Sequence, residues 1–276
     1  MDIRDLFVAI ILGFIEGLTE FLPVSSTGHM IIFDDILLQS HVVLASTELA
    51  NTFKVVIQFA SVLAVVLIFW ERFLWLFKRN SNKANDRSLS MLHFAIALFP
   101  AVILGLLFES FIDRYLFRVE TVIIGLFLGA ILMLAADRFA EENNQALTAY
   151  DDISYRQAFF IGLYQCLALW PGFSRSGATI SGGVMLGLNY RAAADFTFMM
   201  AVPIMFGASG LSLYKKWSFM TGEVVPFFMV GFISAFFFAF ISIRFFLVLI
   251  EKVKLKPFAL YRIVVAIILT IILFLN

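Results

Sequence analysis

The chain contains very little cysteine and very little charge. Cys166 is the only cysteine among 276 residues, so an intramolecular disulfide is excluded and a cysteine-based metal cluster is not expected. Charged residues make up only 14% of the chain, and the 20 basic and 20 acidic side chains balance without any basic tail or stripe. Because nucleic-acid binding needs clustered positive charge, we expect no nucleic-acid partner.

The first residues also lack the features of a removable signal peptide. Asp2, Arg4 and Asp5 stand where a signal peptide would carry a basic run, and no small-residue cleavage pattern follows the first apolar stretch. We therefore expect the N-terminal segment to remain in the mature protein.

Apolar residues, by contrast, make up 62% of the chain, too much for an ordinary water-soluble domain. They lie in long blocks between short charged connections, as expected for helices that cross about 30 Å of hydrocarbon. The 34 phenylalanines suit lipid-facing packing and require no organic cofactor. The sequence predicts an all-α integral membrane protein, a single membrane domain over 1–276, with six transmembrane helices at about 50–70, 91–108, 119–139, 193–213, 224–247 and 257–275.

A further apolar segment, residues 3–15, is too short to cross. Glu16 and Glu20 interrupt it, and Pro23 and Gly28 are expected to break the helix that follows. A helix of about 14 residues reaches only about 21 Å at 1.5 Å per residue. The segment therefore resembles one arm of a re-entrant helical hairpin.

Residues 157–170 form a second short segment, which ends at Pro171 and Gly172 and is followed by another polar, glycine-rich stretch. Membranes tolerate such helix breaks where the irregular backbone is buried in protein or lines a wet cavity. We therefore predict two re-entrant hairpins whose breaks lie near the middle of the membrane.

The two hairpins resemble each other in sequence. An ungapped superposition aligns GFIEGLTEFLPVSSTGHM, from Gly13, with GLYQCLALWPGFSRSGAT, from Gly162. The matches fall on residues where the predicted helices begin or end, such as Ser25 with Ser174. A chance similarity between two apolar stretches is the alternative, but an internal repeat explains more of these matches.

Each repeat, about 1–140 and about 153–276, would contain one hairpin and three spans. An odd number of crossings turns the second copy upside down, so the hairpins enter from opposite faces. This is an inverted-topology repeat, in which broken helices meet at the midplane to build a binding site.

Basic residues in short loops predict the orientation, because the richer side is usually cytoplasmic. The richer side contains Arg72, Lys78, Arg79, Lys83, Arg87, Arg138, Arg156, Arg191, Lys252, Lys254 and Lys256. The other side contains Arg4, Lys54, Arg114, Arg118, Lys215 and Lys216. The mouth of the first hairpin and both chain ends should then face outward.

Glu16 and Glu20 are four residues apart and so share one helix face. Two such carboxylates repel each other unless a cation lies between them or one of them holds a proton. A hard divalent cation, Mg2+ or Ca2+, suits oxygen ligands and would also screen a diphosphate. We predict a metal site at Glu16 and Glu20, with a structural ion pair to Arg175 as the alternative.

His29 follows the first break and can exchange a proton near neutral pH. A lone histidine is usually structural, as we expect for His41 and His93, which lie outside the breaks. His29 differs because serines, a glycine and two glutamates surround it in the sequence, which favours a catalytic role.

Hydroxyl residues stand where the half-helix after each break begins. At least one of them should cap its helix, and a helix N-terminus also offers free N–H groups and partial positive charge to a phosphate. Arg175 adds a forked, permanently charged donor, unless it is a buried arginine paired only with glutamate. The predicted phosphate-binding residues are Ser25, Ser26, Thr27, Ser174, Arg175, Ser176 and Gly177.

The ionic residues of the two breaks are not repeated. In the superposition, Glu16 aligns with Gln165, Glu20 with Leu169, and Arg175 with Ser26. One copy thus carries the acids, the histidine and the hydroxyls, and the other carries the anion clamp. This division favours an asymmetric reaction over symmetric transport.

The strings EGLTEFLPVSSTGHM and LALWPGFSRSGATISGG strongly resemble the bacterial undecaprenyl-diphosphate phosphatases, also called bacitracin-resistance proteins. The resemblance covers nearly the whole chain. It implies functional residues at Glu16, Glu20, Ser26, His29 and Arg175.

The resemblance also implies an activity. The family removes a phosphate from the C55 polyprenyl diphosphate on the outer side of the bacterial cytoplasmic membrane, which recycles the lipid carrier for peptidoglycan synthesis. The expected partners are that lipid and the bilayer, and the oligomeric state stays open, a homodimer included.

Our mechanistic hypothesis is that Arg175 and the two helix N-termini hold the diphosphate, near a cation on Glu16 and Glu20, while Ser26 attacks phosphorus. His29 would take the serine proton or protonate the leaving oxygen. His29 as the nucleophile, or as the activator of a water, fits the sequence equally well. A lipid-carrier transporter or flippase is the rival function, and a non-catalytic scaffold explains the polar breaks poorly.

Overall fold

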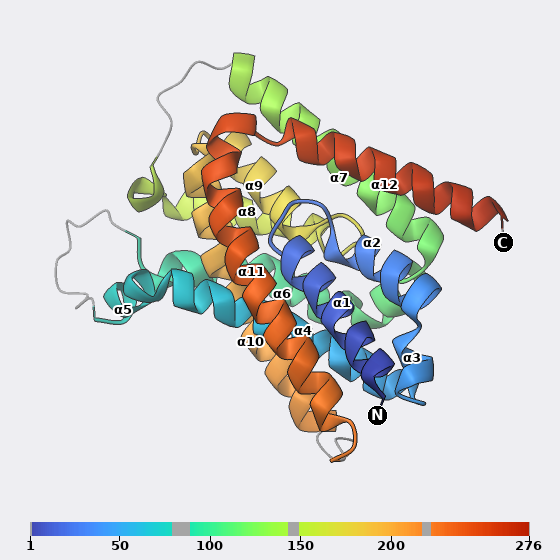
Figure 1. Ribbon diagram of the computed structural model, residues 1–276. Coiled ribbons are helices and arrows are strands. Elements are labelled where there is room, and N and C mark those ends of the chain that lie inside the picture. The colour runs from blue at the N-terminus through green and yellow to red at the C-terminus, as the bar shows by residue number, and fades with distance from the viewer. Residues whose placement is uncertain (1, 79–88, 143–148, 217–221, 276) are drawn as a thin grey trace.

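The computed structural model describes residues 2–78, 89–142, 149–216 and 222–275, and within them the regular structure is helical (Figure 1). The α-helices are α1 (Ile3–Thr19), α2 (Ser26–Met30), α3 (Ser40–Val43), α4 (Thr47–Ile68), α5 (Trp70–Lys78), α6 (Met91–Phe111), α7 (Val119–Glu142), α8 (Tyr155–Leu167), α9 (Arg175–Met185), α10 (Tyr190–Lys216), α11 (Val225–Val253) and α12 (Lys256–Leu275). The π-helical segments are η1 (Ile31–Leu38) and η2 (Ile112–Leu116), and η3 (Tyr150–Asp152) is a 3-10 turn.

Five of the described helices are long and apolar enough to cross a membrane: α4, α6, α7, α11 and α12. They coincide with five of the six predicted spans and confirm the all-α class expected of an integral membrane protein. The sixth predicted span, 193–213, lies within α10, which has 27 residues and contains Pro203. Since α10 is not among the five, its crossing stays a prediction.

The first hairpin differs from the prediction at two points. The helix does not stop at residues 3–15 but continues to Thr19, because Glu16 lies on its buried face. Gly28 does not break the chain, since it lies inside α2, where an added Cβ would be 3.3 Å from Leu126 of α7. The actual break is the segment 20–25, between the end of α1 and the start of α2.

The second hairpin follows the prediction more closely. Helix α8 ends before Pro171 and Gly172, and α9 begins at Arg175. Gly172 has a φ of +89° and lies so close to α7 that a methyl group would collide with the Val122 carbonyl. Both the left-handed backbone and the close approach therefore require glycine at this position.

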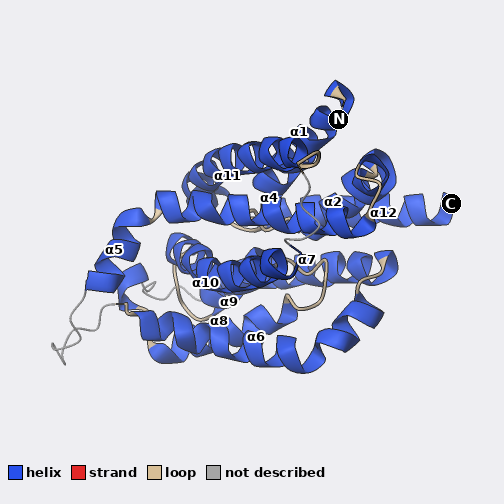
Figure 2. Cartoon of the chain, turned by 90° about the horizontal axis from the view of Figure 1, so that it is seen from below, coloured by secondary structure: helices blue, strands red, loops and turns tan. Residues whose placement is uncertain are grey.

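Each hairpin packs against the other half of the chain. Helix α1 lies along α11, whereas α8 lies along α6, and these pairs fall in different layers of Figure 2. Gly13 and Gly162, which align in the repeat, make the equivalent contacts, since a Cβ on either would strike a carbonyl, of Gly231 or of Ala97. Small residues allow such close helix packing, which is the main source of helix association in lipid.

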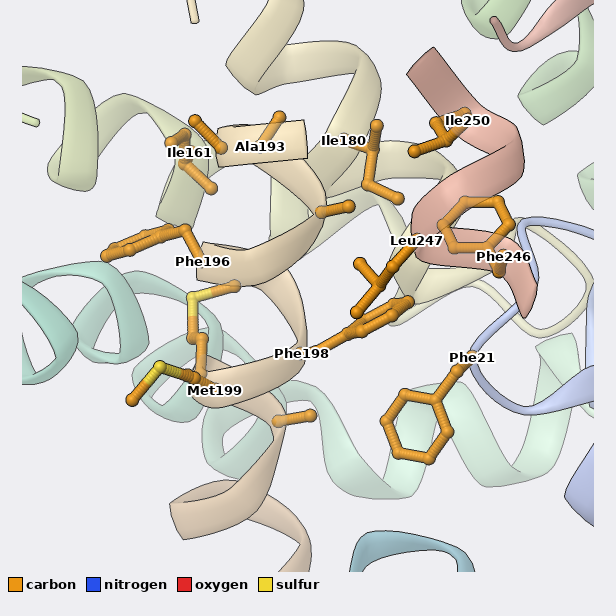
Figure 3. Close-up of a cluster of buried hydrophobic side chains, with 14 of the residues drawn as sticks. Phe21, Ile161, Ile180, Ala193, Phe196, Phe198, Met199, Phe246, Leu247 and Ile250 are labelled. Carbon is orange, nitrogen blue, oxygen red and sulfur yellow. The ribbon is translucent and has the colours of Figure 1, made fainter. Parts of the chain in front are cut away.

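The largest cluster of buried apolar side chains surrounds the first break and α10. Figure 3 shows Phe21, from the first break, beside Phe198 of α10, with Phe246 and Leu247 of α11 next to them. The ring centroids of Phe21 and Phe198 are 5.1 Å apart, in an edge-to-face arrangement. This packing fixes the position of the first break relative to α10.

Two of the basic residues predicted on one side of the membrane meet at the same acidic residue. Arg72 and Arg191, predicted on the same side, share the carboxylate of Asp195 at 2.8 and 3.0 Å. Figure 2 shows both chain ends at one end of the molecule and α5 at the opposite end. The predicted contributions of Arg79, Lys83 and Arg87 lie outside the described residues.

Replacement of Gly13 or Gly162 by alanine should lower the thermal unfolding midpoint of the purified protein in detergent. The added methyl group strikes a backbone carbonyl of the packed helix, and overpacking of this kind costs about 1–3 kcal/mol. Gly105→Ala in α6 is the matched control, because its Cβ would be 3.5 Å from Leu169, an ordinary contact. Equal midpoints for the three variants would contradict the proposed close packing.

Candidate active site

The two breaks meet at one cavity of about 270 Å³. Both hairpins and two of the longer helices, α4 and α10, contribute to its wall. The lining residues are Glu20, Ser25, Ser26, Thr27, Gln58, Ala168, Trp170, Pro171, Gly172, Ser174, Arg175, Ile204 and Met205. Polar groups from two sequence-distant breaks therefore line a single, partly open cavity.

Ser25 and Ser174 cap the two half-helices in the same way. Their φ angles are 71° and 70°, and each side-chain oxygen accepts from the backbone N–H three residues later, at 3.4 Å from Gly28 and 3.2 Å from Gly177. The predicted capping is confirmed. A left-handed backbone conformation costs a non-glycine residue about 1–2 kcal/mol. Because both serines adopt it, the surrounding contacts must hold the backbone in this conformation at each break.

The carboxylate of Glu20 joins the two breaks. Ser26 donates its hydroxyl to Oε2 at 2.7 Å, and Arg175 donates to Oε1 at 3.3 Å. The Glu20 and Arg175 side chains are only 8% and 16% exposed. In so little water the two opposite charges attract strongly, and each compensates for the burial of the other.

Arg175 is not saturated by this ion pair. Its second terminal nitrogen is 2.8 Å from the sulfur of Met205, and its Nε lacks a hydrogen-bond partner among the described residues. A thioether is a weak acceptor, whereas a guanidinium has five donors. Arg175 therefore lines the cavity with a guanidinium whose donors are not all satisfied by the described residues.

Glu16 lies one helical turn before Glu20 and is buried. Its Oε1 has no hydrogen-bond partner within the described part of the chain. An orphaned carboxylate oxygen beside a second carboxylate fits a hard cation such as Mg2+ or Ca2+. The described residues contain no group of three or more His, Cys, Asp or Glu side chains placed to hold a metal ion, so the protein would supply two carboxylates.

His29 does not face the cavity. Its Nδ1 is 2.8 Å from the carbonyl oxygen of Ser25, and its Nε2 is 2.7 Å from the hydroxyl of Tyr261 in α12. The group at hydrogen-bond distance from the Ser26 hydroxyl is the carboxylate of Glu20, not the imidazole.

The structure thus divides the predicted site residues into two sets. Those it brings together around the cavity are Glu20, Ser25, Ser26, Thr27, Ser174 and Arg175. Those that do not line the cavity are Glu16, His29, Ser176 and Gly177. Ser176 instead joins the two hairpins, because its hydroxyl donates to the carbonyl of Leu22 at 3.0 Å.

Several lining and supporting residues were missed by the sequence reasoning. Trp170 and Met205 are apolar residues in apolar segments and gave no signal. Gln58 and Arg262, however, interrupt two predicted spans, and a polar residue at membrane depth is itself a sign of function. Tyr261 could not have been found, because its importance depends on a contact with a residue 232 positions away.

Comparisons with known proteins agree with the resemblance predicted from the two motifs. A sequence model of the family described as bacitracin resistance protein BacA matches residues 9–268, which include every candidate site residue. A protein of Geobacillus kaustophilus is 57% identical over 270 residues, 98% of each chain, and one of Bacillus subtilis is 58% identical over 276 residues, 99% of each chain. Both are named undecaprenyl-diphosphatase. The chain belongs to the bacitracin resistance protein BacA family.

Proposed function

We propose that this protein hydrolyses undecaprenyl diphosphate to undecaprenyl phosphate and inorganic phosphate, recycling the lipid carrier of peptidoglycan synthesis and conferring bacitracin resistance. One observation carries the proposal: in a cavity built by both breaks, the carboxylate of Glu20 holds a serine hydroxyl and an arginine. The names of the relatives support the same reaction.

The diphosphate would occupy the cavity, with its polyprenyl tail in the surrounding lipid. The free donors of Arg175 suit its oxygens, and the N-terminus of the 11-residue α9 adds unpaired N–H groups and partial positive charge. The hydroxyls of Ser25, Thr27 and Ser174 line the same wall. Binding would thus rest on the arginine and on backbone donors from the second break.

Ser26 is the proposed nucleophile. Its oxygen forms a bond to the terminal phosphorus while its proton passes to Oε2 of Glu20, 2.7 Å away. The bond from that phosphorus to the bridging oxygen breaks, and undecaprenyl phosphate leaves with the electron pair. Water then attacks the phosphoserine, which releases inorganic phosphate and restores the Ser26 hydroxyl.

The alternatives in which His29 is the nucleophile or activates a water would require its ring to leave Tyr261. A divalent cation held by Glu16 and Glu20 would supply charge neutralisation for the diphosphate. The residues fit such an ion because Glu16 presents an oxygen without a partner in the described chain.

The proposed setting is the bacterial cytoplasmic membrane, with six spans, two re-entrant hairpins and the cavity open to the outer side. The equivalent caps at Ser25 and Ser174 and the equivalent contacts of Gly13 and Gly162 support an inverted repeat over about 1–140 and 153–276. The rival function, a lipid-carrier transporter, receives no support from the relatives, which are named for hydrolysis.

Ser26→Ala and Glu20→Gln should each reduce phosphate release from undecaprenyl diphosphate to background, because one removes the attacking oxygen and the other its proton acceptor. Single-turnover reactions with labelled terminal phosphate should leave label on the parent protein but not on Ser26→Ala. Thr270→Val, which removes a hydroxyl that donates to Ala266 within α12, is the control and should retain activity. Persistent label on Ser26→Ala would exclude the serine as nucleophile.

Arg175→Lys should lower kcat/KM by about 10²–10³-fold, the usual loss when one preorganised donor to a developing charge is removed. Lysine keeps the positive charge but cannot present two parallel donors to a phosphate. Arg244→Lys is the control, because Arg244 is an exposed residue of α11. Full activity in Arg175→Lys would show that charge alone suffices.

Chelation by EDTA should abolish phosphate release, and addition of Mg2+ or Ca2+ should restore it. Glu16→Gln should raise the metal concentration that gives half of the maximal rate, since it removes one charged ligand. Glu251→Gln, at an exposed position, should leave that concentration unchanged. Undiminished turnover after complete chelation would contradict the metal site.

A further inference from the structure

Two consecutive residues of α12 contact the two breaks from behind the cavity. The hydroxyl of Tyr261 is 2.7 Å from His29 of the first hairpin, and the guanidinium of Arg262 is 2.9 Å from the Gly172 carbonyl of the second. Neither residue lines the cavity. One turn of one helix is therefore connected to both halves of the site.

The hydrogen bonds of His29 specify its tautomer. A backbone carbonyl can only accept, so the nitrogen that faces Ser25, Nδ1, must carry the hydrogen. In the neutral ring, the lone pair is then on Nε2, and the hydroxyl of Tyr261 donates to it. The two rings are nearly parallel, at 9°, with centroids 5.6 Å apart. Both nitrogens are engaged, and the ring cannot also accept the proton of Ser26.

The position of Ser26 depends on this arrangement. Ser25, immediately before it, has the unfavourable left-handed conformation, and His29 donates to its carbonyl. The Tyr261 hydroxyl keeps the imidazole in the tautomer and orientation that this hydrogen bond requires. The chain Tyr261, His29, Ser25 thus sets where the next residue presents its hydroxyl to Glu20.

Arg262 has the corresponding place behind the second break. Its guanidinium is fully buried, and one nitrogen donates both to Gly172 and, at 3.2 Å, to the Gly125 carbonyl of α7. A Cβ added at Gly129 of α7 would collide with this guanidinium. The guanidinium therefore occupies space that is free only because residue 129 is glycine. Within the described residues no carboxylate pairs with Arg262. One terminal nitrogen donates to the break that leads to Arg175, the other is 3.6 Å from the sulfur of Met133, and Nε has no hydrogen-bond partner in the described chain.

We propose that Tyr261 and Arg262 are positioning residues for the phosphatase reaction, and that His29 acts through Ser25 rather than as the acceptor of the Ser26 proton. Together they hold the two breaks so that Ser26 and Arg175 meet at Glu20. The assignment rests on the proposed function for its kinetic consequences, but the tautomer of His29 can be measured in the absence of any reaction.

The kinetic test is Tyr261→Phe, which removes one oxygen and keeps the ring. The rate constant kcat should fall about 10- to 100-fold, because a displaced reacting group is costly, whereas KM should stay within about threefold. Tyr155→Phe is the matched control, since the Tyr155 ring stacks on His93 at 4.0 Å, away from the cavity lining. A kcat equal to that of the parent protein would overturn the role of Tyr261.

The spectroscopic test uses the full-length protein in bilayers with 15N-labelled histidine, without substrate. The sequence has three histidines, and His29→Gln identifies the signal of interest. The parent protein should show His29 protonated at Nδ1 alone, and Tyr261→Phe should add the Nε2-protonated form. An unchanged signal would overturn the inference even if phosphate release is normal, whereas a parent protein that releases no phosphate would contradict only the proposed function.

Arg262→Lys tests the second contact. It keeps the charge but lacks the planar guanidinium that occupies the space beside Gly129. A folded variant, by size exclusion and thermal unfolding, with a kcat at least about tenfold lower and a nearly unchanged KM would support positioning. A folded variant with normal kcat, or one that fails to fold, would overturn this assignment, because the residue would then be dispensable or structural.

Discussion

The structure depends on satisfying the backbone hydrogen-bonding groups that two helix breaks release inside an apolar helical bundle. Where lipid replaces water, each unpaired N–H or C=O is costly, so a break persists only if protein groups replace the lost helical bonds. Here side chains do so: Ser176 donates to Leu22, the Trp170 indole donates to Thr121 at 2.8 Å, and Arg262 donates to Gly172. The same side chains hold the two breaks in place around the cavity that we propose for the diphosphate.

The ionic groups follow from the same constraint. Glu20, from one break, compensates the charge of the buried Arg175 guanidinium from the other, so charge compensation and assembly of the site are one interaction. Glu20 also accepts a hydrogen bond from Ser26. Of the other Arg175 nitrogens, one faces the sulfur of Met205 and Nε has no acceptor among the described residues. A phosphate could therefore accept hydrogen bonds from these donors without the loss of any strong hydrogen bond.

Local sequence predicted the breaks well, because proline, glycine and capping serines act within a few residues of themselves, as at Ser25 and Ser174. Apolar blocks likewise predicted five spans. The end of α1 was predicted less well, since whether Glu16 continues a helix depends on what covers it. The direction of the His29 ring was beyond local reasoning, because the ring is fixed by Tyr261, a residue brought to it only by folding.

The two halves of the chain differ in their scaffolding as well as in the ionic residues of their breaks. Helices α7 and α12, the last of each proposed repeat, lie side by side, as Figure 1 shows. At the second break α7 contributes glycines, Gly125 and Gly129, whose lack of side chains admits both the break and a guanidinium, and α12 contributes that guanidinium from Arg262. The glycines of α7 leave room that the arginine of α12 fills. This fit requires the two helices to differ in sequence. If the fold is a repeat, as we propose, an asymmetric reaction centre requires asymmetry in the helices that support it.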